Sequence, residues 1–493
     1  MLSFIDKLLN KITMYRLVLY YLIILLVIAG IFGAIGWLPY SPFALAFSTG
    51  ALIVIALITN KIFAEAFKTQ TNSESAYITA LILALIITPI FWTDLNGIIF
   101  LAWTAILAMA SKYILAIRKK HLFNPAAFAV ALTAFTIGQS ASWWVGGNLP
   151  LMAFVLAGGF LVVRKIQRFD LVLAFLGAAA VSAAFTANQF DPLGTLQKMA
   201  LHTPIFFFAS IMLTEPLTTP PTRDKRIAYG LFTGFLFAPA IHFGPVYSTP
   251  ELALLAGNVF SWLFSPKEKY LVRLKEKSEV GKDIYHFTFE LPKPIKFRPG
   301  QYMEWTLGHE KTDLRGNRRY FTIASSPTEP DLQLGVKFYE PSSSFKQRLR
   351  ELEPGDEIMA GQLAGDFTLP RDKKTKLAFI AGGIGITPFR SMAKYLSDRG
   401  EKRPVVLIYA AQTGDGFAYR EIFEEAGQKI GLKAVYAEGR LDPAFIAKQI
   451  PDHLERVFYL SGPRSMVVAF EAALHRMGVP RKQIKTDFFP GFA

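Results

Sequence analysis

The chain has 493 residues, a formal net charge of +15 and no cysteine, and 52% of its residues are hydrophobic. This length is too great for one typical domain. The lack of cysteine excludes disulfides, thiolate-held iron–sulfur clusters and a cysteine nucleophile. No basic stripe with interleaved aromatic residues is present, so the positive charge does not indicate nucleic acid, and membrane proteins normally place their excess Lys and Arg in cytoplasmic loops. We expect no nucleic-acid partner and no metal site.

Hydrophobic residues are unevenly distributed along the chain. Long apolar runs fill residues 1–265, whereas the later residues are mixed and charged. This predicts an all-α, multi-pass membrane domain over 1–265, followed by a soluble half. The first run, Leu17 to Leu38, is expected to be a retained helix, because it is too long for a signal-peptide core. Ten spans are predicted, at 17–38, 42–60, 77–93, 98–117, 126–138, 149–163, 171–187, 201–213, 228–246 and 250–264.

The charge distribution predicts an orientation. If the N-terminus lies in the cytoplasm and the spans alternate, nearly all Lys and Arg residues between spans fall on the cytoplasmic side, and Lys198 alone falls on the other. This bias follows the positive-inside rule. We therefore expect a protein of the cell (inner) membrane with its N-terminus and soluble half in the cytoplasm.

Two polar stretches adjoin short spans, H-L-F-N-P-A-A-F from His121 to Phe128 and S-I-M-L-T-E-P-L-T-T-P-P-T from Ser210 to Thr222. Polar groups near a bilayer are usually functional or capping. Asn124, Thr214 and Glu215 are therefore candidate cofactor-binding residues, or else turn and N-cap residues. The matching positions of the stretches suggest an inverted repeat with a site between its halves.

These stretches, with S-E-S-A-Y-I-T-A-L-I-L-A-L from Ser73 to Leu85, resemble the flavin-carrying membrane subunits of the sodium-pumping NADH:quinone reductase and the related Rnf complex. Glu215 stands where that family has Asp. The resemblance implies a membrane flavin, FMN or riboflavin, and a quinone or extracytoplasmic acceptor. The segment that carries covalent FMN in the family is not matched, since Phe190 to Lys198 retains only Thr195. A non-covalent flavin is therefore favoured.

Residues 267–371 contain short alternating runs punctuated by Gly and Pro, which predict a small antiparallel β-barrel. One strand contains R-Y-F-T, with Arg319 and Phe321 on one face and Tyr320 and Thr322 on the other. A cation, an aromatic ring and a hydroxyl are the groups that a flavin nucleotide needs.

Residues 374–493 alternate strands with helices, which predicts an α/β domain whose parallel sheet binds a ligand at the carboxyl ends of its strands. The run F-I-A-G-G-I-G-I-T-P-F-R-S-M, from Phe379 to Met392, reads as a strand, a tight turn and a helix N-terminus that can hold phosphate. S-G-P at Ser461 to Pro463 marks a second strand end.

Residues 267–493 resemble the ferredoxin–NADP reductase family, with further matches at P-G-Q-Y, S-S-F-K, G-D-F and T-D-F-F-P-G-F. The resemblance implies FAD and NAD(P)H as cofactors. It implies that Arg319 holds the FAD pyrophosphate, that Phe321 stacks on the flavin beside Tyr320, and that Thr322 bonds near the flavin N5. It also implies catalytic roles for Thr322 and Ser461, and cofactor contacts from Ser344, Lys346, Gly382, Gly383, Gly385, Thr387, Pro388, Gly462, Pro463, Met466 and Phe489.

Several assignments stay open. Ser344 could belong to an ordinary turn, Lys346 could be a solvated helix charge, and Phe489 could pack against the barrel. Asp415 would favour NADH by repelling a 2′-phosphate, whereas Arg420 would favour NADPH; we lean to NADH.

The sequence thus predicts a membrane-bound flavoprotein oxidoreductase that passes electrons from NAD(P)H through FAD and a membrane flavin to quinone or an extracytoplasmic acceptor. One rival is a haem-type transmembrane reductase, which needs paired histidines; the membrane half has only His121, His202 and His242, in no stacked pair. The other rival is a transporter with a regulatory flavoprotein domain. Ion coupling and oligomeric state stay open.

Overall fold

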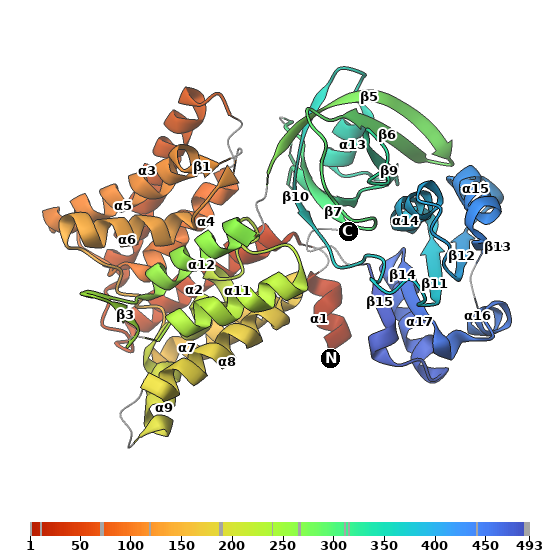
Figure 1. Ribbon diagram of the computed structural model, residues 1–493. Helices are drawn as coiled ribbons and strands as arrows, with labels where there is room; N and C mark the ends of the chain where they lie inside the picture. Colours follow the sequence, from red (N-terminus) through yellow and green to blue (C-terminus); the bar gives the residue numbers. More distant parts are fainter. Residues whose placement is uncertain are drawn as a thin grey trace. The chain divides into compact units, whose positions relative to one another are not determined.

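The computed structural model describes residues 2–9, 12–69, 73–117, 120–186, 191–238, 240–264, 268–309, 312–313, 316–439 and 442–487. It divides into two compact units, with the boundary between Glu268 and Lys269. The first unit is helical and the second combines two β-sheets with helices (Figure 1). The predicted division of the second unit at residues 371–374 stays a prediction, because that unit is compact as a whole.

The helical unit contains long and short helices in alternation. Five of its described helices are long and apolar enough to cross a membrane: α2 (Met14–Ala34), α3 (Pro42–Ala66), α5 (Leu95–Ile114), α7 (Leu149–Ile166) and α8 (Phe169–Thr186). The other helices are α1 (Leu2–Leu9), α4 (Ser73–Ile86), α6 (Pro125–Ile137), α9 (Pro192–His202), α10 (Ile205–Phe207), the π-helix η1 (Phe208–Met212), α11 (Arg223–Leu236) and α12 (Pro250–Phe264). Two hairpins, β1 (Ala116–Ile117) with β2 (Lys120–His121) and β3 (His242–Phe243) with β4 (Val246–Tyr247), complete it.

The expected ten spans are therefore not confirmed. The predicted span 77–93 ends early, because α4 stops at Ile86 and its last carbonyls accept from the 142–145 loop: Ile86 O accepts from Trp143 N at 2.9 Å, and Ala84 O from the Trp144 indole at 2.9 Å. The predicted span 201–213 is split into α10 and the π-helix. Such broken helices persist at membrane depth only where other protein groups satisfy their backbone.

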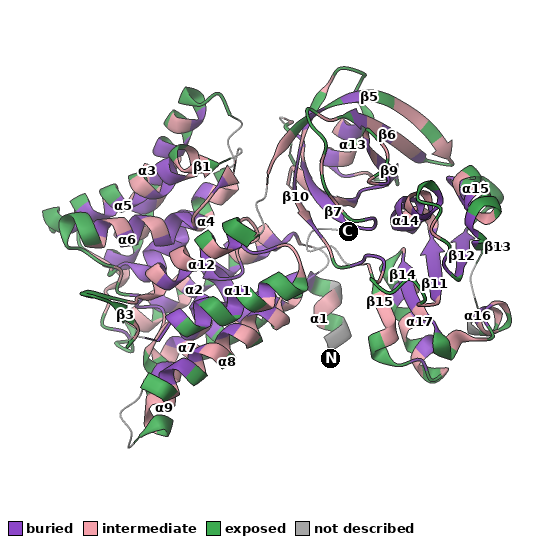
Figure 2. Ribbon diagram, in the orientation of Figure 1, coloured by how far each residue is buried: buried purple, intermediate pink, exposed green. Residues whose placement is uncertain are grey.

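Exposed residues follow the outer surface of the helices of this unit (Figure 2). Many of them carry large apolar side chains, and Ile24, Leu173 and Phe185 are 56%, 66% and 86% exposed. Water does not favour so many exposed apolar side chains, whereas lipid accepts them. The unit is thus built as a membrane domain.

The second unit begins with an antiparallel sheet of six strands in the order β8-β7-β10-β5-β6-β9. The described strands do not confirm a closed barrel: β8 and β9 stand at opposite ends of this order, and one backbone bond beyond β8, Ala324 N to Gln333 O at 2.8 Å, links them. Trp305, Phe287 and Phe289 fill the core on one face. The elements are β5 (Tyr270–Gly281), β6 (Ile284–Glu290), β7 (Tyr302–Thr306), β8 (Arg318–Thr322), β9 (Leu332–Lys337), α13 (Ser344–Arg350) and β10 (Glu357–Ala364).

A five-stranded parallel sheet follows, in the order β13-β12-β11-β14-β15. The chain order reverses between β11 and β14, which makes this the switch point where parallel sheets bind ligands. The parallel α/β architecture was predicted; β15 was not. The elements are β11 (Leu377–Gly382), the 3-10 turn η2 (Gly383–Ile386), α14 (Thr387–Asp398), β12 (Val405–Ala411), α15 (Arg420–Ile430), β13 (Lys433–Glu438), α16 (Pro443–Gln449), β14 (Val457–Ser461), α17 (Arg464–Arg476) and β15 (Ile484–Thr486).

Helices α8 and α11 pack with their backbones in close contact, which generates a stability prediction. A Cβ on Gly230 would lie 2.7 Å from the carbonyl oxygen of Leu171, and one on Gly234 would lie closer still to that of Phe175. Two glycines four residues apart let helices approach in this way. We expect Gly234→Val to destabilise the membrane unit by about 1–3 kcal/mol, measured as a lower unfolding midpoint of the purified full-length protein.

The matched control is Gly177→Val on α8, where an added Cβ meets nothing within 4 Å. Equal unfolding midpoints for the two variants would contradict close α8–α11 packing.

Candidate functional site

The switch point of the parallel sheet is formed by two loops in backbone contact. An added Cβ on Gly385 would collide with the Ser461 carbonyl, and one on Gly462 would lie 3.0 Å from the Gly382 backbone. Gly382 has no Cβ, and the Met466 thioether occupies the adjacent space. These glycines are needed because the loops after β11 and β14 touch.

One glycine at this point serves a different purpose. Gly383 has φ +53°, and a Cβ added there would meet nothing within 4 Å. It therefore borders open space at the carboxyl end of β11, directly before the helix that starts at Thr387 and Pro388. An open glycine turn at a helix N-terminus fits the phosphates of a dinucleotide.

Ser461 ends β14 at the same edge, and its hydroxyl donates to Asp487 Oδ2 at 2.9 Å. Asp487 follows β15, and its own N–H donates to Leu460 O at 2.9 Å. The sequence analysis did not single out Asp487, although it lies in the matched T-D-F-F segment. Phe489, predicted to contact the cofactor, lies outside the described residues.

Strand β8 carries the predicted flavin residues on alternate faces. Arg319 lies with its guanidinium 5.2 Å from the Phe345 ring centroid, and the Phe321 ring packs against the same ring, tilted by 42° with 6.1 Å between centroids. On the opposite face, Tyr320 donates to Glu304 Oε2 at 2.7 Å and meets Tyr302 edge-on. The alternation inferred from R-Y-F-T is therefore what the structure has.

One nitrogen of the Arg319 guanidinium donates to backbone carbonyls of neighbouring residues. Its Nη1 donates to Gly316 O at 3.1 Å and to Arg318 O at 2.6 Å. A guanidinium is a planar donor group that suits a pyrophosphate, so the residue type fits the predicted role, which stays a prediction. Together with the Phe321 ring and the buried Thr322 hydroxyl, this donor set fits FAD.

Ser344 and Lys346 make local contacts in the structure, and their contacts with the cofactor stay a prediction. Ser344 Oγ accepts from Asp313 N at 3.0 Å and pairs with His309 Nε2 at 2.9 Å. Lys346 donates to Lys337 O at 2.7 Å and lies over the Tyr339 ring. Both side chains thus make local structural contacts.

Two further assignments concern the loop after β12. Asp415 accepts from Thr413 Oγ1 at 2.5 Å, and this bond lowers the pKa of the Asp415 carboxyl. Arg420 lies 4.8 Å from the ring centroids of both Phe417 and Tyr436, so its guanidinium is held between two rings.

A cluster that the sequence analysis missed joins the antiparallel sheet to this loop. His286 on β6 bonds the Tyr419 hydroxyl at 3.0 Å, and Arg390 lies over the Tyr419 ring. Arg390 also pairs with Glu329, Nη2 to Oε1 at 2.9 Å. Tyr419 itself has φ +64°. No short motif signals this cluster, because its members come from four separate segments.

The two polar stretches of the helical unit meet in space. The Glu215 carboxylate accepts from Asn124 Nδ2 at 3.0 Å and Thr218 Oγ1 at 3.1 Å, and it pairs with His121 Nε2 at 3.2 Å. Thr214 does not join them: its hydroxyl donates to Ser210 O at 2.7 Å within its own turn. Asn124 also caps α6 by accepting from Ala127 N, which confirms the capping interpretation, and its role in a cofactor site stays a prediction.

Burial lowers the pKa of His121, which favours the neutral imidazole. For Glu215, burial alone would raise the pKa, but the bonds from His121 and Thr218 outweigh it and lower the pKa. The pair is therefore a neutral imidazole whose Nε2–H donates to a carboxylate.

Comparisons with known proteins find a matching family model in each half of the chain. Residues 144–270 match the NQR2, RnfD, RnfE family, residues 271–367 an oxidoreductase FAD-binding domain, and residues 379–471 an oxidoreductase NAD-binding domain. Both predicted resemblances are thereby confirmed, although the Ser73 and Asn124 stretches lie outside the matched range. The chain carries an FAD/NAD oxidoreductase module fused to a membrane domain of the NQR2/RnfD type.

Individual relatives match the module. Flavohemoproteins of Halalkalibacterium halodurans and Deinococcus radiodurans are 27% and 28% identical, over 45% and 39% of this chain and 59% and 51% of theirs. The chain thus spans only half to three fifths of these relatives. Two solved structures are also similar. The Amycolatopsis cytochrome P450 reductase is 22% identical, with a TM-score of 0.42, and the match covers 45% of this chain and 70% of that one. The Plasmodium falciparum ferredoxin–NADP+ reductase is 18% identical, with a TM-score of 0.39, and the match covers 45% of this chain and 97% of that one.

The His286 cluster generates a pH prediction. Burial, with Arg390 nearby, lowers the pKa of His286 to about 4. Below about pH 6.5 the His286 imidazole binds a proton in the unfolded chain but stays neutral in the folded cluster. The free energy of unfolding therefore falls as the pH drops from 6.5 towards 4. We expect His286→Asn, which keeps an acceptor for Tyr419, to reduce this loss.

The measurement is the unfolding midpoint of full-length wild type and variant at pH 7 and pH 5. Other titrating groups are common to both proteins, so equal midpoint shifts would show that His286 contributes nothing.

Proposed function

We propose that the protein is a membrane-bound, FAD-dependent NAD(P)H oxidoreductase that delivers electrons to an acceptor at its membrane domain, a quinone or an extracytoplasmic compound. The observation that carries this proposal is the glycine-lined switch point between β11 and β14, in one compact unit with the β8 donor set. FAD, when bound, accepts hydride from NAD(P)H and can release the electrons one at a time.

The residues of the chain would act by binding and orientation. Arg319 would neutralise the pyrophosphate, and Phe321 would hold one face of the ring system. Thr322, 5% exposed, would offer its hydroxyl at a fixed, water-poor position. Ser461, fixed by Asp487, would position the nicotinamide at the strand end. Orientation of this kind can supply much of a rate enhancement.

We further infer that the membrane domain is an internal repeat. In the first half α3 packs on α5 and α5 on α6; in the second, α8 packs on α11 and α11 on α12. In the first half the short helix α4 precedes α5, and in the second half the short segment of α10 and η1 precedes α11. The polar cluster of Asn124 and Glu215 joins the two halves, and a membrane flavin beside it, bound without a covalent link, remains part of the proposal. We place the N-terminus and soluble unit in the cytoplasm on the charge bias.

Flavin content tests this function. We expect purified full-length protein to contain FAD, to oxidise NADH, and to lose flavin on acid precipitation. Arg319→Ala should weaken FAD binding about tenfold or more, because a charge-assisted contact to the pyrophosphate is lost.

The control is Arg273→Ala, whose side chain is 61% exposed on β5. A wild-type protein without flavin or NAD(P)H oxidation would refute the proposal, and flavin that stays with the acid precipitate would indicate a covalent link.

Nucleotide choice is a separate prediction. We propose NADH, because Asp415 is charged at neutral pH and Arg420 is held between two rings. Asp415→Asn should lower the ratio of kcat/KM for NADH over NADPH about threefold, by removing repulsion of the 2′-phosphate. Glu425→Gln on α15, which removes another exposed carboxylate, should leave the ratio unchanged. A wild-type preference for NADPH would contradict the assignment.

A further inference from the structure

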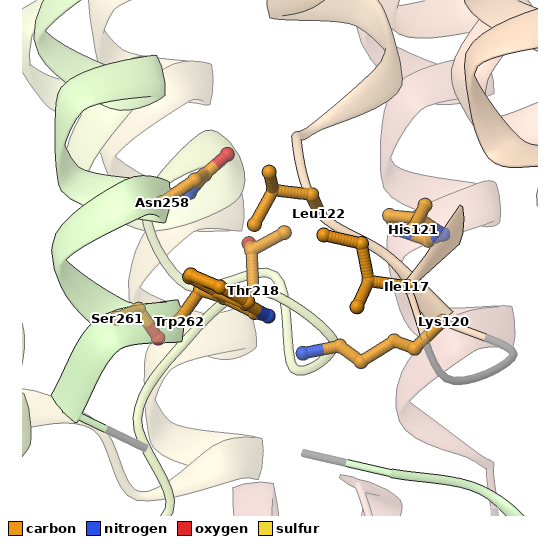
Figure 3. A pocket seen from close by; sticks show the side chains of 8 residues that line it. All are labelled: Ile117, Lys120, His121, Leu122, Thr218, Asn258, Ser261 and Trp262. Carbon is orange, nitrogen blue, oxygen red and sulfur yellow. The ribbon is translucent and has the colours of Figure 1, made fainter. Parts of the chain in front are cut away.

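A pocket of the membrane domain lies where several helices end. It is lined by groups from the β1–β2 hairpin, the chain after η1, and the last turns of α12 (Figure 3): Ile117, Lys120, His121, Leu122, Thr218, Asn258, Ser261 and Trp262. Its volume is about 260 Å³, including space open to solvent. Helix α5 ends at Ile114 and α12 at Phe264, so the pocket lies where the apolar helices stop. In a membrane protein this is the level of the lipid headgroups.

The acceptors around the pocket are already engaged by protein donors. Glu215, behind His121, receives bonds from Asn124 and Thr218 besides its pairing with the imidazole. Asn258 Oδ1 accepts from the backbone N–H of Asn124 at 2.7 Å. A ligand that brought only donors would therefore find little to bind.

Two side chains that carry donors, Lys120 and Trp262, line the same space. In Figure 3 the Lys120 ammonium and the Trp262 ring nitrogen both point into the region that the lining side chains enclose. Ser261, a hydroxyl that can also donate, lies beside Trp262 in the chain. An ammonium, an indole N–H and a hydroxyl together suit an anionic acceptor such as a phosphate.

The surface beside the pocket is apolar. Trp262 is 38% exposed, and Val259, Leu263 and Phe264 on the same helix are 38%, 60% and 58% exposed. Ile117, on the hairpin side, is 39% exposed. Lys and Trp at the end of a lipid-facing helix are the typical anchors of a bilayer interface. A ligand with an anionic head and apolar chains satisfies both parts of this surface.

We propose that this pocket binds an acidic phospholipid, with its phosphate held by Lys120 and Trp262 and its acyl chains along α12. Basic pockets at the ends of membrane helices recognise such headgroups. The site is independent of FAD and nicotinamide binding, so its test does not depend on the proposed redox activity.

The test uses native mass spectrometry of the full-length protein in detergent, titrated with phosphatidylglycerol or with phosphatidylcholine of the same chains. We expect phosphatidylglycerol to bind more tightly, and Lys120→Gln to weaken that binding about fivefold, which is the effect of one basic residue near an anionic surface. Trp262→Phe should weaken it too, because it removes the N–H but keeps the ring. Lys61→Gln, an exposed charge on α3, is the matched control and should have no effect.

Equal retention of the two lipids, or wild-type retention by both pocket variants, would overturn the proposal. Displacement of phosphatidylglycerol by millimolar inorganic phosphate or FMN would also overturn it, because the pocket would then be a site for free phosphates. Unfolding midpoints of all variants separate loss of binding from loss of fold, and Trp262→Phe keeps the test decisive should Lys120→Gln not fold.

Discussion

The soluble unit depends on the backbone contact between the loops that follow β11 and β14. A Cβ on Gly385 would collide with the Ser461 carbonyl, and one on Gly462 would lie only 3.0 Å from the backbone of Gly382. This contact brings the glycine turn, the helix that begins at Thr387 and the Ser461 hydroxyl to one edge of the sheet. Because β11 and β14 pair side by side, two strand ends far apart in the sequence form a single edge, and the glycines let the loops that follow them pack closely.

The membrane domain is governed by the complementary constraint that every buried polar group must be satisfied. The carbonyls at the end of α4 are satisfied by the 142–145 loop and by the Trp144 indole. The carboxylate of Glu215 is satisfied by Asn124, Thr218 and His121. Broken helices and a buried carboxylate are tolerated because these partners are supplied from distant parts of the chain.

Within the soluble unit, the His286 cluster links the two sheets. Tyr419 is bonded to the antiparallel sheet through His286, while Arg390 on α14 contacts the Tyr419 ring and pairs with Glu329. The loop after β12 is therefore fixed against the antiparallel sheet and α14.

The sequence by itself determined the two-part organisation, the antiparallel and parallel sheets, and the alternation of Arg319 and Phe321 against Tyr320. These follow from local periodicity and from residue types, which the chain carries in contiguous segments. It did not determine where α4 ends, that Thr214 bonds within its own turn, or that Lys346 turns to β9. Nor did it reveal the partners of Ser461, His286 and Glu215. Those were decided by tertiary structure, because each depends on which distant backbone or side chain satisfies a polar group after folding.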